Sequence, residues 1–172
     1  YKLINDPKIL VHNTADYGVP QIRKRVIIMG VRKDITTKEA MDLYNGVVKT
    51  HWNPETDLVE RKGLKKFVSV KDAIGDLPSV EPGEDASTNS YDYPCNNAFL
   101  KRIGKAGIHP LMDHIARKHN ALDRERFAIM INNHWSFGQL RKEMPQYEHE
   151  HARVFDNSYV VQWWDLPSKT IL

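Results

Sequence analysis

Apolar runs near the start of the chain predict two strands joined by a tight turn. Residues 8–16 (KILVHNTAD) combine β-branched and apolar side chains over the length of a strand, and Gly18 and Pro20 follow as turn residues. In residues 25–32 (RVIIMGVR), the apolar run from Val26 to Met29 is typical of a strand covered on both faces within an α/β sheet. Because the connection is too short for a crossover helix, we expect an antiparallel hairpin.

Beyond this hairpin the periodicity weakens and turn residues become frequent. A short helix is expected over residues 36–44 (TTKEAMDLY), and the change of texture after it predicts a domain boundary near residue 48. A second short helix is expected in residues 69–78 (SVKDAIGDLP), where Ser69 and Asp72 have the spacing of a capping box and Pro78 ends the segment.

The second half of the chain predicts a loop followed by short helices. Residues 79–94 are acidic and rich in Pro, Gly, Ser and Asn, so we expect a loop there. Residues 157–172 are typical of a strand and a turn. Three short helical segments are expected between them, around residues 97–106, 111–119 and 123–132, with Asp123 as the candidate cap of the last.

Composition indicates a soluble globular chain. Its 172 residues suffice for one domain, or for one small domain plus a fragment of another, and its apolar runs are too short to cross a bilayer. Tyr1 is not an initiator methionine and no signal peptide follows it, so we expect the stretch to begin inside a longer protein. A single cysteine, Cys95, excludes an internal disulfide framework and suits a reducing cytoplasm.

The net charge of +3 is modest, but the charge is unevenly distributed. Residues 1–33 hold seven basic against two acidic residues, whereas residues 71–95 hold one basic against six acidic residues. Residues 101–126 are again basic, with seven against three. Two basic blocks around an acidic one suit a folded surface with basic faces better than a disordered tail.

The basic triplet Arg23 to Arg25 stands directly before the apolar run. Alternate side chains of a strand share a face, so Gln21, Arg23 and Arg25 are expected to project together, with Ile22 and Lys24 on the other side. Paired guanidinium groups suit phosphate oxygens. Charges that flank an apolar strand also keep it soluble, and spacing alone favours that second interpretation.

Residues 15–32 (ADYGVPQIRKRVIIMGVR) closely resemble the eighth motif of the DNA (cytosine-5) methyltransferases, Asp-Tyr-Gly-x-Pro-Gln-x-Arg-x-Arg followed by a strand that ends in Gly. The matching residues are Asp16, Tyr17, Gly18, Pro20, Gln21, Arg23, Arg25 and Gly30. Residues 163–171 (WWDLPSKTI) resemble the start of the ninth motif. Its matching residues are Trp164, Pro167, Ser168, Thr170 and Ile171. The resemblance therefore carries specific residues at both ends of the chain.

The middle of the chain resembles the target-recognition region of the same family. Residues 69–78 are similar to the segment that opens this region in many bacterial members, and residues 91–102 and 113–127 are similar to a polar, His-containing helical segment. The implied fold is α/β: the C-terminal hairpin of a Rossmann-like, S-adenosylmethionine-dependent methyltransferase domain plus a small mixed α+β target-recognition domain. The resemblance assigns residues 1–48 to the end of the catalytic domain, 49–155 to target recognition and 156–172 to a return into the catalytic domain.

The resemblance also implies a reaction and its partners. Members flip a cytosine out of duplex DNA, attack its ring with a cysteine thiolate and transfer a methyl group from S-adenosylmethionine to carbon 5. The motif's arginines face the flipped nucleotide and its phosphates, a role that Arg23 and Arg25 inherit beside Gln21. Other implied partners are the remainder of the catalytic domain and a cognate restriction system, in the cytoplasm of a bacterium near the nucleoid.

Two further basic segments are candidates for phosphate contacts. Residues 60–67 (ERKGLKKF) offer Lys65 and Lys66, and residues 114–119 (HIARKH) offer Arg117. A solvated charged face explains each segment at least as well.

The motifs for the cofactor loop, the Pro-Cys nucleophile and the Glu-Asn-Val segment are absent from the chain. We therefore expect neither a catalytic residue nor bound S-adenosylmethionine in this stretch alone; truncation explains the absence most simply, and circular permutation is the alternative. Cys95 follows a proline but lies after the eighth motif, among acidic residues that disfavour a thiolate. No metal site is expected, since His149 and His151 lack further ligands and His114 and His119 suit packing or hydrogen bonds.

Alternatives to an enzyme remain open from the sequence. The chain could be a DNA-binding module without catalysis, such as a degenerate relative or a recognition subunit. An unrelated α/β protein with a chance match would need two distant motifs to arise in the correct order.

Overall fold

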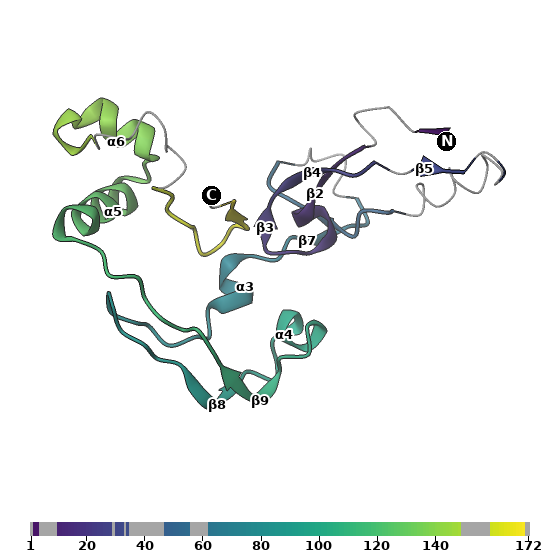
Figure 1. Cartoon of the computed structure of the whole chain (residues 1–172), viewed down its shortest axis with the longest axis horizontal. Coiled ribbons are helices and arrows are strands. Elements are labelled where there is room, and N and C mark those ends of the chain that lie inside the picture. The colour runs from purple at the N-terminus through teal and green to yellow at the C-terminus, as the bar shows by residue number, and fades with distance from the viewer. Residues whose placement is uncertain are drawn as a thin grey trace. The chain divides into compact units, whose positions relative to one another are not determined.

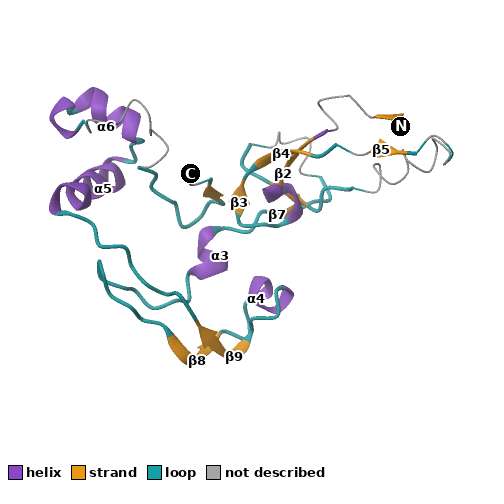
Figure 2. Ribbon diagram, viewed as in Figure 1, coloured by secondary structure: helices purple, strands orange, loops and turns teal. Residues whose placement is uncertain are grey.

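The computed structural model describes residues 2–3, 10–28, 30–32, 34, 47–55, 62–148 and 159–170. Within these ranges the secondary structure is mixed α/β, with short strands and short helices (Figures 1 and 2). The chain divides into two compact units. The first is Tyr1–Val70 with Trp164–Thr170, and the second is Lys71–Trp163 with Ile171–Leu172.

The first unit consists of short paired strands around a turn of 3₁₀ helix. Its elements are β1 (Lys2–Leu3), β2 (Val11–Asn13), η1 (Thr14–Tyr17), β3 (Gln21–Ile22), β4 (Lys24–Val26), β5 (Gly30–Val31), β6 (His51–Trp52), β7 (Lys65–Lys66) and β10 (Ser168–Lys169). β2 pairs antiparallel with β4 and β1 pairs antiparallel with β5. The predicted antiparallel hairpin is therefore confirmed for β2 and β4. Two parallel pairs, β6 with β7 and β10 with β3, are the other pairings among the unit's described residues.

The predicted covering of the apolar run on both faces is wrong for the described residues. Val26, Ile27 and Ile28 are 61%, 44% and 66% exposed. The physical reason is that β4 does not lie inside a larger sheet: among the described strands it pairs with β2 alone. Met29 lies outside the described residues.

Helix α3 (Val70–Ile74) begins where the first unit ends, and the second unit holds the remaining elements. These are β8 (Thr88–Tyr93), α4 (Ala98–Arg102), β9 (Gly107–Leu111), α5 (Ala121–Asn133), α6 (Phe137–Glu143) and η3 (Pro145–Tyr147). The helices predicted within residues 69–78, 97–106 and 123–132 are confirmed as α3, α4 and α5. Helix α6 was not expected, although Ser136 and Gln139 form a full capping box at its start.

Two predictions for the second unit are wrong. The expected loop of residues 79–94 contains strand β8, which pairs antiparallel with β9. The expected helix of residues 111–119 is extended, because its backbone bonds to the preceding loop: Ala116 N donates to Glu84 O at 2.8 Å, and Ala86 N donates to His114 O at 2.9 Å. Non-local backbone partners have overridden weak local preferences at both places.

The hairpin β8–β9 and the helices α5 and α6 have separate apolar cores. Tyr93, Leu100 and Leu111 are buried together beside the hairpin. Met130, Phe137 and Leu140 are buried between α5 and α6, which are joined by a short turn in which His134 adopts φ 57°. The cap of α5 is Asn120, whose Oδ1 accepts from the backbone N of Asp123 at 2.7 Å. The predicted cap Asp123 is therefore wrong, because its carboxylate instead accepts from Arg126 and Tyr159.

The compact units separate after Val70 and after Trp163, whereas the sequence predicts functional boundaries near residues 48 and 155. Position 48 lies within the first unit. Position 155, the expected helix of residues 36–44, and His149 and His151 lie outside the described residues. The assignment of these ranges to catalytic and recognition domains stays a prediction. In the described part of the chain, no helix is both long and apolar enough to span a bilayer.

Candidate nucleic-acid interface

The connection between β2 and β4 is a tight, internally bonded turn. Asn13 caps η1, and Gly18 ends it in the left-handed conformation at φ 77°, with its N–H bonded to Ala15 O. A side chain at that φ would be strained by about 1–2 kcal/mol, so the turn favours glycine at this position. On the way back, Val19 N donates to Thr14 O at 3.3 Å. These hydrogen bonds fix the backbone of the turn that precedes the basic triplet.

The end of the chain joins this turn. β10 pairs in parallel with β3, so that Ser168 lies opposite Gln21 and Lys169 lies opposite Ile22. Ser168 N donates to Pro20 O at 2.9 Å, and Thr170 Oγ1 donates to Ile22 O at 2.9 Å across 148 residues of sequence. The two segments that resemble the eighth and ninth motifs are therefore adjacent strands of one unit.

The register of β2 and β4 places the basic side chains on different faces. Arg25 lies opposite His12, whereas Lys24 lies opposite Asn13, and residues opposite each other in an antiparallel pair share a face. Arg23 belongs to neither strand, because β3 ends before it and β4 begins after it. Arg23 and Arg25 are exposed, and Arg25 Nη1 donates to Lys24 O at 2.7 Å.

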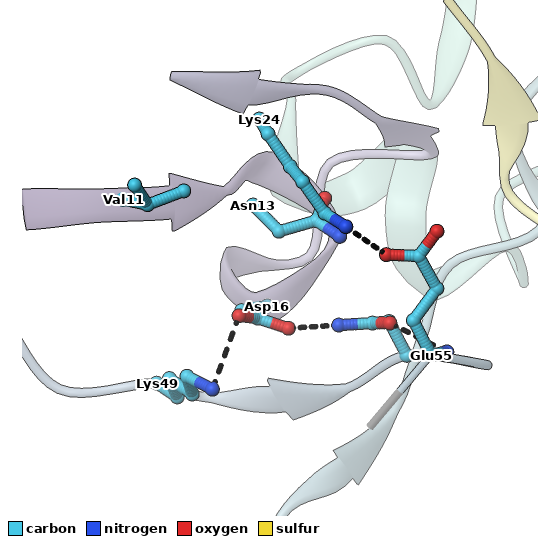
Figure 3. Close-up of a pocket in the computed structure, with 7 residues that line it drawn as sticks. Val11, Asn13, Asp16, Lys24, Lys49 and Glu55 are labelled. Atoms are coloured by element: carbon cyan, nitrogen blue, oxygen red, sulfur yellow. Dashed lines mark hydrogen bonds and ion pairs between the residues drawn. The ribbon is translucent and has the colours of Figure 1, made fainter. Parts of the chain in front are cut away.

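A buried carboxylate connects the turn to residues 49–55 (Figure 3). Asp16 is 5% exposed; its carboxylate accepts a hydrogen bond from Asn53 Nδ2 and lies 3.4 Å from Lys49 Nζ. Its backbone carbonyl accepts from Thr50 N at 3.0 Å. Sequence analysis did not find Asn53, which is buried and lies 37 residues downstream of Asp16.

These residues line a surface hollow of about 210 Å³. Its lining consists of Val11, Asn13, Asp16, Lys24, Lys49, Asn53 and Glu55. Lys24 Nζ lies 2.8 Å from Glu55 Oε2, and this hydrogen bond raises the pKa of the Lys24 ammonium above its ordinary value. Both partners are exposed, so solvent screens the pair and it contributes little to stability. The charge of Lys24 is nevertheless compensated locally.

The other predicted contacts divide between the two units. Lys65 and Lys66 form the exposed strand β7 of the first unit, and Lys66 Nζ lies 5.1 Å from the centre of the Phe67 ring. Arg117 is exposed on the extended segment after β9 in the second unit. The structure thus places Gln21, Arg23, Arg25 and the two lysines in one unit, and Arg117 in the other.

Comparison with known proteins decides the family. The family model described as C-5 cytosine-specific DNA methylase matches residues 6–159. The chain belongs to this family. Type II methyltransferase M.NgoFVII of Neisseria gonorrhoeae is 35% identical over 167 residues, 94% of this chain and 32% of the relative. Type II methyltransferase M.DdeI of Desulfomicrobium norvegicum is 27% identical over 150 residues, 87% of this chain and 31% of the relative.

Another relative matches a shorter part of the chain with a higher sequence identity. Type II methyltransferase M.BspRI of Lysinibacillus sphaericus is 49% identical over 71 residues, 41% of this chain and 14% of the relative. The chain therefore spans a third or less of the length of these three relatives. No solved structure matches the chain significantly.

In the described part of this family member, the remaining candidate groups have ordinary surroundings. Cys95 is exposed in the turn after β8, with its Sγ 4.0 Å from Tyr93 O. His114 has its Nε2 2.8 Å from Pro78 O, and His119 packs edge-on against Phe127, as expected for hydrogen-bonding and packing histidines. Among the described residues, no group of three His, Cys, Asp or Glu side chains could hold a metal ion.

Proposed function

We propose that the chain is the part of a DNA (cytosine-5) methyltransferase that binds duplex DNA, recognises a short target sequence and helps to hold the flipped cytosine. Its first 48 residues end the Rossmann-like catalytic domain, residues 49–155 recognise the target and residues 156–172 return to the catalytic domain. The observation that carries the proposal is the parallel pairing of β10 with β3. It makes one structural unit of two segments that each resemble a family motif, beside the exposed arginines.

The basic edge of the first unit has the chemistry for the nucleotide. Arg23 and Arg25 present exposed guanidinium groups close to the turn, and Gln21 precedes them in β3. Guanidinium groups bind phosphate oxygens bidentately, whereas an amide can hydrogen-bond a base edge or a phosphate. Lys65, Lys66 and Arg117 add sequence-independent phosphate contacts in this proposal.

The methyl donor of this family is S-adenosylmethionine, and the described hollow does not fit it. At about 210 Å³ the hollow is smaller than pockets for drug-sized ligands, which are roughly 300–1,000 Å³. Its lining charges are also paired with each other. We therefore propose that the cofactor site and the nucleophilic cysteine belong to other parts of the enzyme, and that this stretch alone is inactive.

The exposed apolar side chains of Val26, Ile27 and Ile28 suit contact with the rest of the catalytic domain. Burying them would remove apolar surface from water, which is favourable. The proposed setting is the cytoplasm of a bacterium, at the nucleoid, with a cognate restriction enzyme as the functional counterpart. The restriction enzyme as counterpart is supported by the type II methyltransferases of bacteria to which the chain is similar.

The test uses the intact protein that contains this chain, with Arg23→Ala, Arg25→Ala and Lys24→Ala variants. Arg25→Ala is expected to depress tritium transfer to a mixed-sequence duplex more than it weakens binding. Arg23→Ala is expected to weaken binding and to lower its salt dependence by one contact, about 0.9 log units per log unit of salt. Lys24→Ala is the matched control, since Glu55 already compensates this charge.

The outcomes separate the proposal from its alternative. Damage by Lys24→Ala equal to that by Arg25→Ala, in a folded protein, would contradict the assignment of the arginines. An intact protein that binds duplex DNA but transfers no methyl group would instead be the non-catalytic DNA-binding module or recognition subunit.

A further inference from the structure

Arg23 lies in a gap between two strands, so its backbone needs partners outside the ladder. β3 ends at Ile22 and β4 begins at Lys24. A backbone amide and carbonyl outside a ladder must find other partners, or water. For Arg23, both partners come from the end of β2 and the start of η1. Asn13 Oδ1 accepts from Arg23 N at 3.2 Å, and Thr14 N donates to Arg23 O at 3.1 Å.

The same two residues also hold the backbone before Arg23. Thr14 Oγ1 donates to the carbonyl of Gln21 at 2.6 Å. The Asn13 side chain, which is buried, shares its Oδ1 with the N–H of Ala15 at 3.3 Å, and so it is fixed by the helical turn that it caps. The backbone is therefore bonded on both sides of Ile22, while the Arg23 side chain remains exposed.

We infer that Asn13 and Thr14 are positioning residues for Arg23, and this inference rests on the proposed function. A long arginine side chain binds a phosphate more tightly when the backbone that carries it is already fixed. A mobile backbone would have to be ordered on binding, which costs conformational entropy. In this inference Asn13 and Thr14 do not contact DNA themselves. They hold the backbone from which the Arg23 side chain extends to the DNA. Their hydrogen bonds replace the ladder that is missing there.

The test is a double-mutant cycle between residues 14 and 23 in the intact protein. Thr14→Ala removes the hydroxyl that bonds to Gln21 O, and Thr14→Ser retains it. Binding to a fluorescein-labelled, mixed-sequence duplex is measured by anisotropy over a salt series. Thr14→Ala should weaken binding about two- to tenfold, as expected for one hydrogen bond, and should lower the salt dependence toward that of Arg23→Ala. Thr14→Ser should bind like the wild type.

The coupling distinguishes positioning from a general effect on stability. In an Arg23→Ala background, Thr14→Ala should weaken DNA binding much less than in the wild type, because the Arg23 contact is gone. The remaining effect belongs to Gln21, whose carbonyl Thr14 also holds. Equal weakening in both backgrounds, or failure of Thr14→Ser to restore binding, would overturn the inference. If Arg23→Ala itself leaves affinity and salt dependence unchanged, the proposed function of Arg23 fails instead.

A second variant guards against misfolding. Asn13→Ala withdraws the acceptor from Arg23 N and should show the same coupling to Arg23→Ala. Circular dichroism and thermal melting establish which variants fold. Failure of both Thr14→Ala and Asn13→Ala to fold would assign the two residues to stability and overturn the positioning inference.

Discussion

Removing the carboxylate of Asp16 should separate the turn that carries the arginines from residues 49–55. The hydrogen bond from Asn53 Nδ2 joins two residues that are 3% and 5% exposed. A buried hydrogen bond to a charged group contributes about 1.5–3 kcal/mol, and the half-exposed Lys49 partner adds under about 1 kcal/mol. Asp16→Ala should therefore lower the free energy of unfolding by about 2–4 kcal/mol.

Urea denaturation of the 172-residue chain, followed by tryptophan fluorescence, measures this loss. Asp16→Asn keeps an acceptor for Asn53 but loses the charge, so it should cost about 1 kcal/mol. Asn53→Asp alone should lower the stability further, because it places a second carboxylate against Asp16. The double variant Asp16→Asn with Asn53→Asp exchanges the donor and the acceptor, and it should recover part of that loss. A loss below about 0.5 kcal/mol for Asp16→Ala, or no coupling between positions 16 and 53, would refute the reasoning.

Three further predictions concern catalysis, pH and packing. The 172-residue chain alone should show no S-adenosylmethionine binding by calorimetry and no transfer of a tritiated methyl group to DNA. Methyl transfer by the wild-type chain that disappears in Cys95→Ser would contradict the interpretation of Cys95 as an ordinary loop cysteine. Burial raises the pKa of Asp123, but hydrogen bonds from Tyr159 and Arg126 outweigh it and leave the pKa below 3.8. The contribution of Asp123 to the stability of the fold is therefore present above pH 3.8 and is lost as the pH falls through the lower folded-state pKa. In an acid titration followed by circular dichroism, Asp123→Asn should lose less helical signal than the wild type does. Phe137→Ala empties a site that is 2% exposed and should cost about 3–5 kcal/mol in urea denaturation.

Local sequence determined the elements whose stabilising groups are close together along the chain. The hairpin β2–β4 is encoded by its short connection, and Gly18 provides the left-handed residue that the turn requires. Helices α4 and α5 follow from nearby caps, since Asn97 and Asn120 bond to amides only two or three residues ahead. The family resemblance likewise depended on residues contiguous in sequence.

Only the tertiary structure decided which distant segments meet. The loop expected at residues 79–94 contains strand β8 because β9 offers it backbone partners. The helix expected at residues 111–119 is extended instead because its backbone pairs with the loop before β8. The contact of Asp16 with Asn53 and the pairing of β10 with β3 join segments that no local pattern connects. Hydrogen bonds between such segments form only when the chain has brought them together, so the periodicity of neither segment records them.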